Sequence, residues 1–147
     1  GVQTCALPIF TTDVMVGFHE ETEQDFEESL AFVKKISFEK VHVFPYSERT
    51  GTAASKRGDS VSKREKDRRA SVMIAETEKI RQSYLKSQIG KEVQLLVEGR
   101  VNSEYLRGYT KNYLPVLLKS AQDLTGCETD CIIQSVKNDE CIANLDF

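Results

Sequence analysis

The 147-residue sequence predicts an α/β unit followed by a small all-β barrel. The first observation is a strand, helix, strand order between residues 11 and 46, which defines a βαβ unit with parallel strands and a right-handed crossover. The second is a change at Gly90, where helical periodicity gives way to short alternating strands separated by turn residues. We therefore expect an α/β part over 10–59, a linking helix over 60–89 and a barrel over 90–147.

The βαβ unit begins with "TTDVMVGF", residues 11–18, which has the length and β-branched content of a buried strand. Thr22 and Asp25 then stand in a capping-box-like arrangement at the start of a helix. "KVHVFPY", residues 40–46, is the second strand, and Pro45 ends its pairing because proline has no N–H donor. The apolar stripe of the helix combines Phe26, Leu30 and Val33, joined by Phe32 and Ile36. One βαβ unit cannot cover both faces of a parallel sheet, so we expect it to be the tail of a larger α/β domain.

The segment after the second strand is locally basic, with seven cations and three carboxylates between residues 55 and 69. Ser62 and Glu65 form a second capping-box pattern, which begins the linking helix. Its apolar stripe contains Met73, Thr77, Ile80 and Tyr84. The cations are Lys56, Arg57, Lys63, Arg64, Lys66, Arg68 and Arg69. A solvated helix face and contact with nucleic-acid phosphates both remain open for this segment.

The segment from Gly90 reads as about five short strands, enough to close a small barrel of the oligonucleotide-binding kind. These strands cover residues 91–99, 104–110, 113–119, 127–136 and 140–147. In "SEYLRGYTKNYLPV" three tyrosines alternate with Arg107 and Lys111, and aromatic rings beside cations suit exposed bases and phosphates. Ordinary barrel tyrosines are the alternative, and the six basic against nine acidic residues from Gly90 onward argue against non-specific RNA affinity.

Composition and cysteine usage indicate a cytoplasmic protein without a membrane segment. The net charge is −3, no apolar run approaches the roughly 18 residues that span a bilayer, and no secretory signal opens the chain. The cysteines are too sparse for the disulfide framework of a small secreted protein. Cys127 and Cys131 match half of a metal-binding pattern, but no closely spaced third cysteine follows, which favours buried thiols.

The first nine residues, "GVQTCALPI", resemble the translation of a sequencing-library adapter joined to a reading frame. We therefore expect residues 1–9, with Cys5, to be non-native and the gene to be truncated upstream.

Ligands of parallel α/β units bind at the carboxyl ends of the strands, on the loops that follow. Those loops are "GFHEET", residues 17–22, and "PYSERTGTAA", residues 45–54. Strand alternation places Asp13, Met15 and Gly17 on one face of the first strand, and His42, Phe44 and Tyr46 on one face of the second. We assign both of these more polar faces to the interior of a barrel, where Gly17 would let a ligand approach the backbone.

Residues 11–54 resemble the last βαβ segment of the radical S-adenosylmethionine barrel in the tRNA methylthiotransferase family. The family pattern runs close to T-T-D-x-I-V-G-F-P-G-E-T, then a helix, then H-V-F-P-Y-S-x-R-x-G-T-x-A. His19 and Glu20 depart from it, because they replace the usual proline and glycine. The resemblance implies that this strand end helps to form the S-adenosylmethionine pocket, with Asp13, Met15, Gly17, Phe44, Pro45 and Tyr46 as its cofactor-binding residues.

Residues 90–147 resemble the TRAM domain, an RNA-binding barrel that ends many tRNA-modifying enzymes. "GYTKNYLPV" together with "HVFPYS" most resembles the family branch acting on N6-threonylcarbamoyladenosine next to the anticodon. Branches acting on isopentenyladenosine or on a ribosomal protein are the alternatives. The implied partner is tRNA, and the candidate RNA-binding residues are Arg49, Lys63, Arg64, Arg107, Tyr109, Lys111 and Tyr113.

The resemblance further implies methylthiolation of carbon 2 of the adenine, with S-adenosylmethionine and two 4Fe-4S clusters as cofactors of the intact enzyme. C-x-x-x-C-x-x-C does not occur in the sequence, so we assign no catalytic or metal-ligating residue and expect this polypeptide alone to be inactive. The sequence identifies neither the sulfur donor nor the electron donor. Two other classes remain: an autonomous RNA-binding module, and a non-functional fragment that aggregates through an exposed sheet edge.

Overall fold

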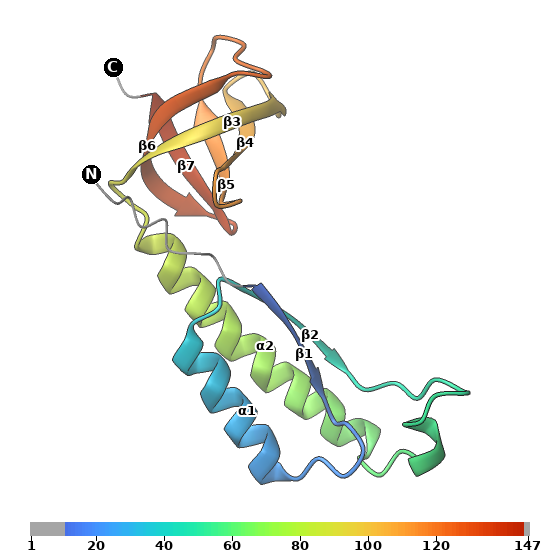
Figure 1. Cartoon of the computed structure of the whole chain (residues 1–147). Helices are drawn as coiled ribbons and strands as arrows, with labels where there is room; N and C mark the ends of the chain where they lie inside the picture. The colour runs from blue at the N-terminus through green and yellow to red at the C-terminus, as the bar shows by residue number, and fades with distance from the viewer. Residues whose placement is uncertain (1–10, 146–147) are drawn as a thin grey trace, which may run out of the picture. The chain divides into compact units, whose positions relative to one another are not determined.

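A computed structural model describes residues 11–145, so the predictions for residues 1–9, including Cys5, lie outside the described residues. The chain forms two compact units, one running to Arg81 and the other beginning at Gln82. Figure 1 shows the order of the elements along the chain. They are β1 (Thr11–Val16), α1 (Glu23–Ile36), β2 (Lys40–Pro45), the short 3-10 helix η1 (Ser55–Arg57), α2 (Lys63–Lys86), β3 (Glu92–Arg100), β4 (Tyr105–Thr110), β5 (Pro115–Lys119), β6 (Glu128–Lys137) and β7 (Glu140–Leu145).

The first unit contains the predicted βαβ arrangement. β1 and β2 pair in parallel with Thr11 opposite Lys40 and Val16 opposite Pro45, which confirms the predicted strand direction. The Tyr46 N–H donates to Val16 O at 2.8 Å, immediately after Pro45, which has no N–H to offer. The two strands therefore end together, and their carboxyl-end loops lie at the same edge of the sheet.

Helix α1 is bounded by local capping interactions. The Thr22 hydroxyl accepts from the Asp25 N–H at 3.2 Å and the Asp25 carboxylate accepts from the Thr22 N–H at 2.9 Å, which confirms the predicted capping box. Ser37 ends the helix in the left-handed region at φ 56°, with its N–H donating to Val33 O. These caps satisfy backbone groups that the helix itself leaves unpaired.

The core of the first unit lies between one face of the sheet and both helices, which run side by side in Figure 1. Its fully or nearly fully buried members are Val16, Phe26, Val33, Ala70 and Met73. The prediction that Phe32 and Ile36 join this stripe is wrong, because they are 57% and 40% exposed. At 100° per residue, Phe32 lies a quarter-turn away from Val33 and leaves the row formed by Phe26, Leu30 and Val33.

Helix α2 begins as predicted, with the Ser62 hydroxyl accepting from the Glu65 N–H at 3.2 Å. Its predicted stripe faces inward: Met73 is fully buried, Thr77 is 8% exposed, and Ile80 and Tyr84 are half-buried. No helix among the described residues has the length and apolarity needed to cross a bilayer.

The second unit contains the five predicted strands, closed into a barrel in the order β3-β4-β5-β7-β6. β3 closes the barrel by pairing antiparallel with both β4 and β6, and β5 pairs in parallel with β7. The core contains Leu95, Val97, Leu106, Val116, Leu118 and Ile133, with Leu85 from the end of α2.

The expectation of buried thiols holds for two cysteines of the barrel. Cys131 and Cys141 are fully buried, and burial, with a smaller effect of Asp130, raises the pKa of the Cys131 thiol to about 11. The expectation is wrong for Cys127, which is exposed just before β6 begins.

Candidate functional site

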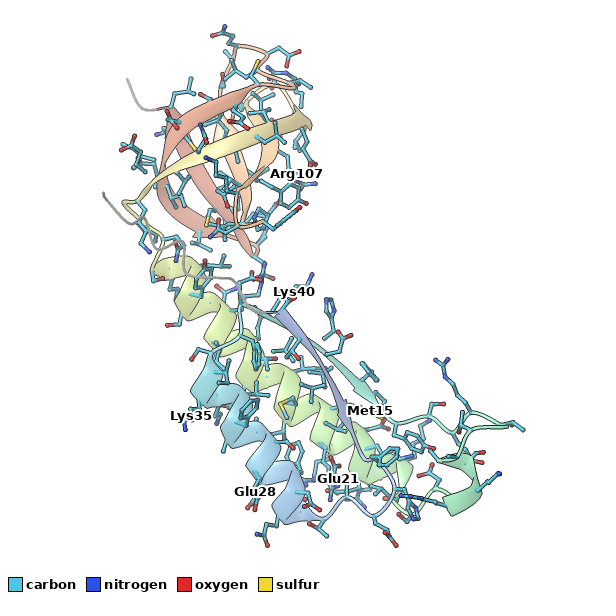
Figure 2. All side chains as sticks on the ribbon, viewed as in Figure 1. Met15, Glu21, Glu28, Lys35, Lys40 and Arg107 are labelled. Atoms are coloured by element: carbon cyan, nitrogen blue, oxygen red, sulfur yellow. The ribbon has the colours of Figure 1, made fainter. Side chains whose placement is uncertain are left out.

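The face of the two-stranded sheet opposite the helices carries the predicted cofactor-binding strand residues. In the parallel register Met15 lies opposite Phe44, and Asp13 lies opposite His42. Met15 and Phe44 are 44% and 42% exposed, and the Asp13 and His42 side chains are also exposed. Figure 2 labels Met15 on β1, near the loop that contains Glu21. This face therefore offers an apolar pair with a carboxylate and an imidazole beside it.

The loop after β1 is stabilised from within and by α2. The Gly17 N–H donates to Glu21 Oε2 at 2.5 Å, and the Glu20 N–H donates to Ser60 Oγ at 2.8 Å. Glu20 has a φ of 62°, in the left-handed region that favours glycine. A glutamate thus occupies a backbone conformation that would suit the glycine standing here in the quoted family pattern.

Gly17 has a backbone conformation and a close neighbour that the sequence did not predict. Its φ of 72° favours glycine, and the space that a Cβ would occupy is taken by the methylenes of Lys66. On that side the close approach to the backbone is made by a side chain of α2, which leaves no room there for a ligand.

Tyr46 differs from its predicted neighbours on the second strand, because it is only 9% exposed while Phe44 and Pro45 are exposed. Its ring packs edge-on against Phe18 with 5.1 Å between the ring centroids, and Lys66 Nζ lies 5.1 Å from its ring centroid. The Tyr46 hydroxyl and His19 Nδ1 are buried and have no hydrogen-bond partner within residues 11–145. The carboxyl end of the sheet thus contains two buried polar atoms that nothing described satisfies.

Two buried cations of α2 bind the loops at this end of the sheet. Lys66 Nζ donates to the Tyr46 carbonyl at 3.2 Å and pairs with Asp59 at 2.5 Å. Arg69 donates to the Glu21 carbonyl oxygen at 2.9 Å and to its carboxylate at 2.7 Å. Both cations are 5% exposed. Their role in this structure is internal, which corrects the idea that the whole basic segment is available to phosphates.

A third cation, Arg68, joins the same network at the surface. It bridges Glu23 and Glu65, with 2.6 Å between the paired atoms in each case. Hydrogen bonding from Arg68, together with Arg69, lowers the pKa of Glu65 to about 2. Burial opposes the charge of Arg69, but hydrogen bonds and charge from Glu21 and its carboxylate neighbours raise the pKa of the guanidinium.

Five cations of the connection between β2 and α2 and of the first turn of α2 remain outside this network. All five are exposed, and none forms an ion pair with any residue from 11 to 145. They are Arg49, Lys56, Arg57, Lys63 and Arg64. The predicted RNA-binding residues Arg49, Lys63 and Arg64 are therefore free of intramolecular charge partners in the described chain.

The β4–β5 turn presents the most exposed large apolar side chain among the described residues of the barrel. Tyr113 is 84% exposed and has a φ of 60°, so an aromatic residue occupies a backbone conformation that favours glycine. The Tyr113 N–H donates to Thr110 O at 2.8 Å, and the Leu114 N–H donates to Thr110 Oγ1 at 3.1 Å. Tyr113 lies in this turn, two residues before β5 begins, and not in the strand where the sequence placed it.

The other predicted RNA-binding residues of the barrel lie on the outer face of β4 or next to it. Tyr109 is half-buried opposite Leu96, which is 46% exposed, and Lys111 is exposed in the turn. Arg107, labelled in Figure 2, pairs with Glu140 at 3.0 Å. Its charge is therefore shared with a carboxylate of β7.

Sequence reasoning missed Glu21, Lys66, Arg69 and Leu96 as parts of these surfaces. Glu21 could have been found from its place in the quoted family pattern, as the acid of the G-E-T step. Lys66 carries no such signal, and the spacing of Arg69 four residues after Glu65 indicates that ion pair but not the one with Glu21.

No protein-family model matches the chain. The threonylcarbamoyladenosine tRNA methylthiotransferase MtaB of Bacillus subtilis is 38% identical over 121 residues, covering 79% of this chain and 27% of that protein. MtaB of Thermotoga maritima is 38% identical over 104 residues, covering 71% and 24%. The tRNA-2-methylthio-N(6)-dimethylallyladenosine synthase of B. subtilis is 36% identical over 129 residues, covering 86% and 25%.

The chain belongs to the tRNA methylthiotransferase family. Within that family it is MtaB-like, and it spans about a quarter of the length of the curated relatives it matches. A solved structure, the apo form of Mycoplasma genitalium RNase R, superposes with a TM-score of 0.37 at 11% identity over 67% of this chain and 20% of that one. That likeness is too weak to bear on fold or function.

Proposed function

We propose that this chain contributes a cofactor-facing sheet and an RNA-binding barrel to an enzyme that methylthiolates carbon 2 of N6-threonylcarbamoyladenosine in tRNA. The observation that carries the proposal is the 38% identity to two proteins named for that reaction, over most of the described chain. The reaction is a group transfer, and the rest of the enzyme would supply the iron-sulfur clusters. The 147 residues by themselves are then inactive.

The exposed sheet face fits the adenosyl part of S-adenosylmethionine. Met15 and Phe44 form an apolar pair in register, with room for a planar ring on their exposed side, and Asp13 is a hydrogen-bond acceptor beside them. Pro45 and the loop that starts at Gly17 would border the same pocket at the carboxyl end of the sheet. When bound, S-adenosylmethionine supplies the radical chemistry, and these residues bind and orient it.

The buried Tyr46 hydroxyl supports a ligand near this edge, because a buried polar atom without a partner is costly unless something satisfies it. The Tyr46 hydroxyl would hydrogen-bond the ligand from beneath the surface that Phe44 and Pro45 form. This position also explains why the loop is bound so firmly by α2, since a cofactor pocket requires fixed walls.

The barrel is proposed as a TRAM-like module of the oligonucleotide-binding kind that binds tRNA. Tyr113 supplies a fully presented ring for stacking on an exposed base, with Tyr109 and Leu96 forming an apolar surface on β4 and β3. Lys111 and Arg107 provide charge next to these rings. Stacking binds bases without a large net positive charge, which suits a barrel that carries more acids than bases.

A pair of chimaeras tests the proposed reaction and its branch. The matching segment of B. subtilis MtaB, or of the dimethylallyladenosine synthase, is replaced by this chain and expressed in a strain that lacks the corresponding enzyme. We expect mass spectrometry of tRNA nucleosides to show restored methylthiolation of threonylcarbamoyladenosine from the MtaB chimaera. Restoration only by the other chimaera would move the chain to the isopentenyladenosine branch, and restoration by neither would contradict the proposal.

A substitution pair makes the same experiment specific to the sheet face. Met15→Glu should abolish modification by the active chimaera, because it places a charge where the adenine would lie. Lys35→Glu changes another exposed residue, in the last turn of α1, and should leave modification intact. Equal activity of the two variants would exclude the β1–β2 face as the cofactor site.

An autonomous RNA-binding module is the second candidate, and one observation favours it. The barrel closes its own hydrogen-bond ladder through β3 and β6 and has its own core, so its strands need no partner to complete the sheet. In that case the 147-residue chain should bind tRNA by itself, with an affinity that falls as salt rises.

A further inference from the structure

We propose that Arg49, Lys56, Arg57, Lys63 and Arg64 form a phosphate-binding patch through which the α/β unit contacts the sugar-phosphate backbone of tRNA. This inference rests on the proposed function, because it specifies which part of the proposed tRNA substrate is contacted and how. The α/β unit would attract tRNA independently of its sequence, and the barrel would stack on its bases.

The first support is the separation of the basic segment into two groups. Three cations form ion pairs within the unit: Lys66, Arg68 and Arg69. Their partners are Asp59, Glu21, Glu23 and Glu65, and two of the three cations are buried. The five patch residues are all exposed and have no ion-pair partner among residues 11–145. The fold thus pairs Asp59, Glu21, Glu23 and Glu65 within the unit and leaves more cations than carboxylates facing solvent.

The second support is that the patch is held in place. Asp59 pairs with Lys66, and Ser60 Oγ accepts from the Glu20 N–H, so the segment after η1 is bound to both α2 and the β1–α1 loop. These two contacts stand between Lys56 and Arg57 on η1 and Lys63 and Arg64 on the first turn of α2. Figure 1 shows η1 next to the start of α2. Two exposed acids adjoin the patch without an ion-pair partner among the described residues: Glu48, beside Arg49, and Asp67, one helical turn after Lys63 and Arg64.

The third support is electrostatic. Cations in the first turn of a helix face the positive end of its dipole, which costs a few tenths of a kcal/mol each at a surface. Lys63 and Arg64 occupy that position in α2. An anion that binds both the cations and the helix end removes this unfavourable interaction.

The fourth support comes from the barrel, which carries six basic and nine acidic residues from Gly90 onward. Such a barrel repels a polyanion at long range, yet tRNA carries one charge per nucleotide. Binding of tRNA therefore needs a cationic surface elsewhere, and this patch is the densest group of unpaired cations in the described chain.

Fluorescence anisotropy of labelled tRNA with the full 147-residue chain, titrated at several salt concentrations, tests the patch. Lys56→Gln/Arg57→Gln and Lys63→Gln/Arg64→Gln should each lower the slope of log K against log salt by roughly 1.5, since each phosphate contact contributes about 0.7 to 0.9. Lys35→Gln/Lys40→Gln removes the same charge from the opposite end of the unit, as Figure 2 shows, and should leave the slope unchanged. Lys56→Arg should retain the wild-type slope.

The outcomes separate the patch from the proposed function. A wild-type chain that binds tRNA with a steep slope that both glutamine pairs leave intact overturns the patch alone. Equal loss in the Lys35→Gln/Lys40→Gln control also overturns it, because any surface cation would then serve. No wild-type binding at all overturns the patch and the autonomous RNA-binding module, whereas the proposed reaction is tested separately by the chimaeras. Binding to anionic phospholipid vesicles in place of tRNA, lost in the same variants, would assign the cations to a lipid surface and reject the RNA patch.

Discussion

Arg69 of α2 donates from one guanidinium nitrogen to both the backbone carbonyl and the carboxylate of Glu21, at 2.9 and 2.7 Å. The same carboxylate accepts the Gly17 N–H, so a single glutamate joins the end of β1 to the helix that follows the sheet. The two paired side chains are 6% and 12% exposed. The conformation of the β1–α1 loop thus depends on a nearly buried ion pair.

Arg69→Met should destabilise the α/β unit by about 3 kcal/mol, because it leaves the Glu21 carboxylate buried without its partner. The Arg69→Met/Glu21→Met double variant should recover much of that loss, since no uncompensated charge remains. Urea titrations followed by helical circular dichroism measure both. A double variant no more stable than the single one would show that the pair itself, and not the orphaned charge, stabilises the fold.

Gly17→Ala should cost more stability than Gly51→Ala. Both glycines have a positive φ, so each substitution incurs about 1 kcal/mol of left-handed strain. Only at Gly17 would the new Cβ overlap the Lys66 side chain, whereas nothing lies within 4 Å of the corresponding position at Gly51. The difference between the two free energies of unfolding isolates the contact with Lys66, and equal values would rule that contact out.

Glu20→Gly should stabilise the chain by about 0.5 kcal/mol or leave it unchanged, because its φ of 62° suits glycine and strains other residues. Glu27→Gly is the matched control within α1, where glycine should destabilise by about 1 kcal/mol. Thermal unfolding measures the two opposite shifts. Destabilisation by Glu20→Gly would mean that the glutamate side chain contributes more than the backbone strain costs.

Stability of the α/β unit should fall as the pH drops from about 4.5 towards 2. Lys34 first and then Lys79 lower the pKa of Glu76 from 4.5 to about 2, so the folded state prefers the charged form. A depressed folded-state pKa contributes stability above the unfolded value, and that contribution is lost as pH falls through the folded one. Glu76→Gln should flatten the dependence in this window, as urea midpoints from pH 6 to 2 would reveal, and an unchanged pH dependence in that variant would contradict the role of Glu76.

Tyr113→Gly should move stability and RNA binding in opposite directions. Glycine relieves the left-handed backbone at φ 60°, which favours the folded barrel by up to about 1 kcal/mol. Loss of the ring should weaken tRNA binding by about 1 to 3 kcal/mol if one base stacks on it. Asn138→Gly, at φ 50° in the β6–β7 turn, should share the first effect without the second. Unchanged tRNA binding by Tyr113→Gly would remove Tyr113 from the RNA surface.

Local signals in the sequence predicted the elements well. The capping boxes at Thr22 and Ser62 and the alternation in β3 to β7 are set by neighbours within a few residues, so they could be recognised without a fold. The parallel pairing of β1 and β2 followed from the helix between them. The Phe32 error has the same origin, because counting apolar residues overlooked the angle at which each leaves the helix.

The sequence predicted which strand residues form the candidate site, but not the contacts from α2 that hold the site in place. The register that pairs Met15 with Phe44 follows from the alternation of two adjacent strands, which a sequence displays. The inward turn of Tyr46 and the filling of the space at Gly17 depend on α2, which contacts them from 20 and 49 residues further along the chain. Local helix spacing indicates the pairs of Glu65 with Arg68 and Arg69, but no local pattern indicates that Lys66 meets Asp59 or that Arg69 meets Glu21.

The sequence by itself determined the order of the elements, the parallel strands, the five-stranded barrel and the family, because periodicity, caps and motifs are written in residues close to one another. Only the tertiary structure decided that Lys66 and Arg69 are buried and bound while Lys63 and Arg64 remain exposed and unpaired. The physical reason is that a cation is buried or exposed according to how close the fold brings it to carboxylates far along the chain and to water. Folding alone sets those distances.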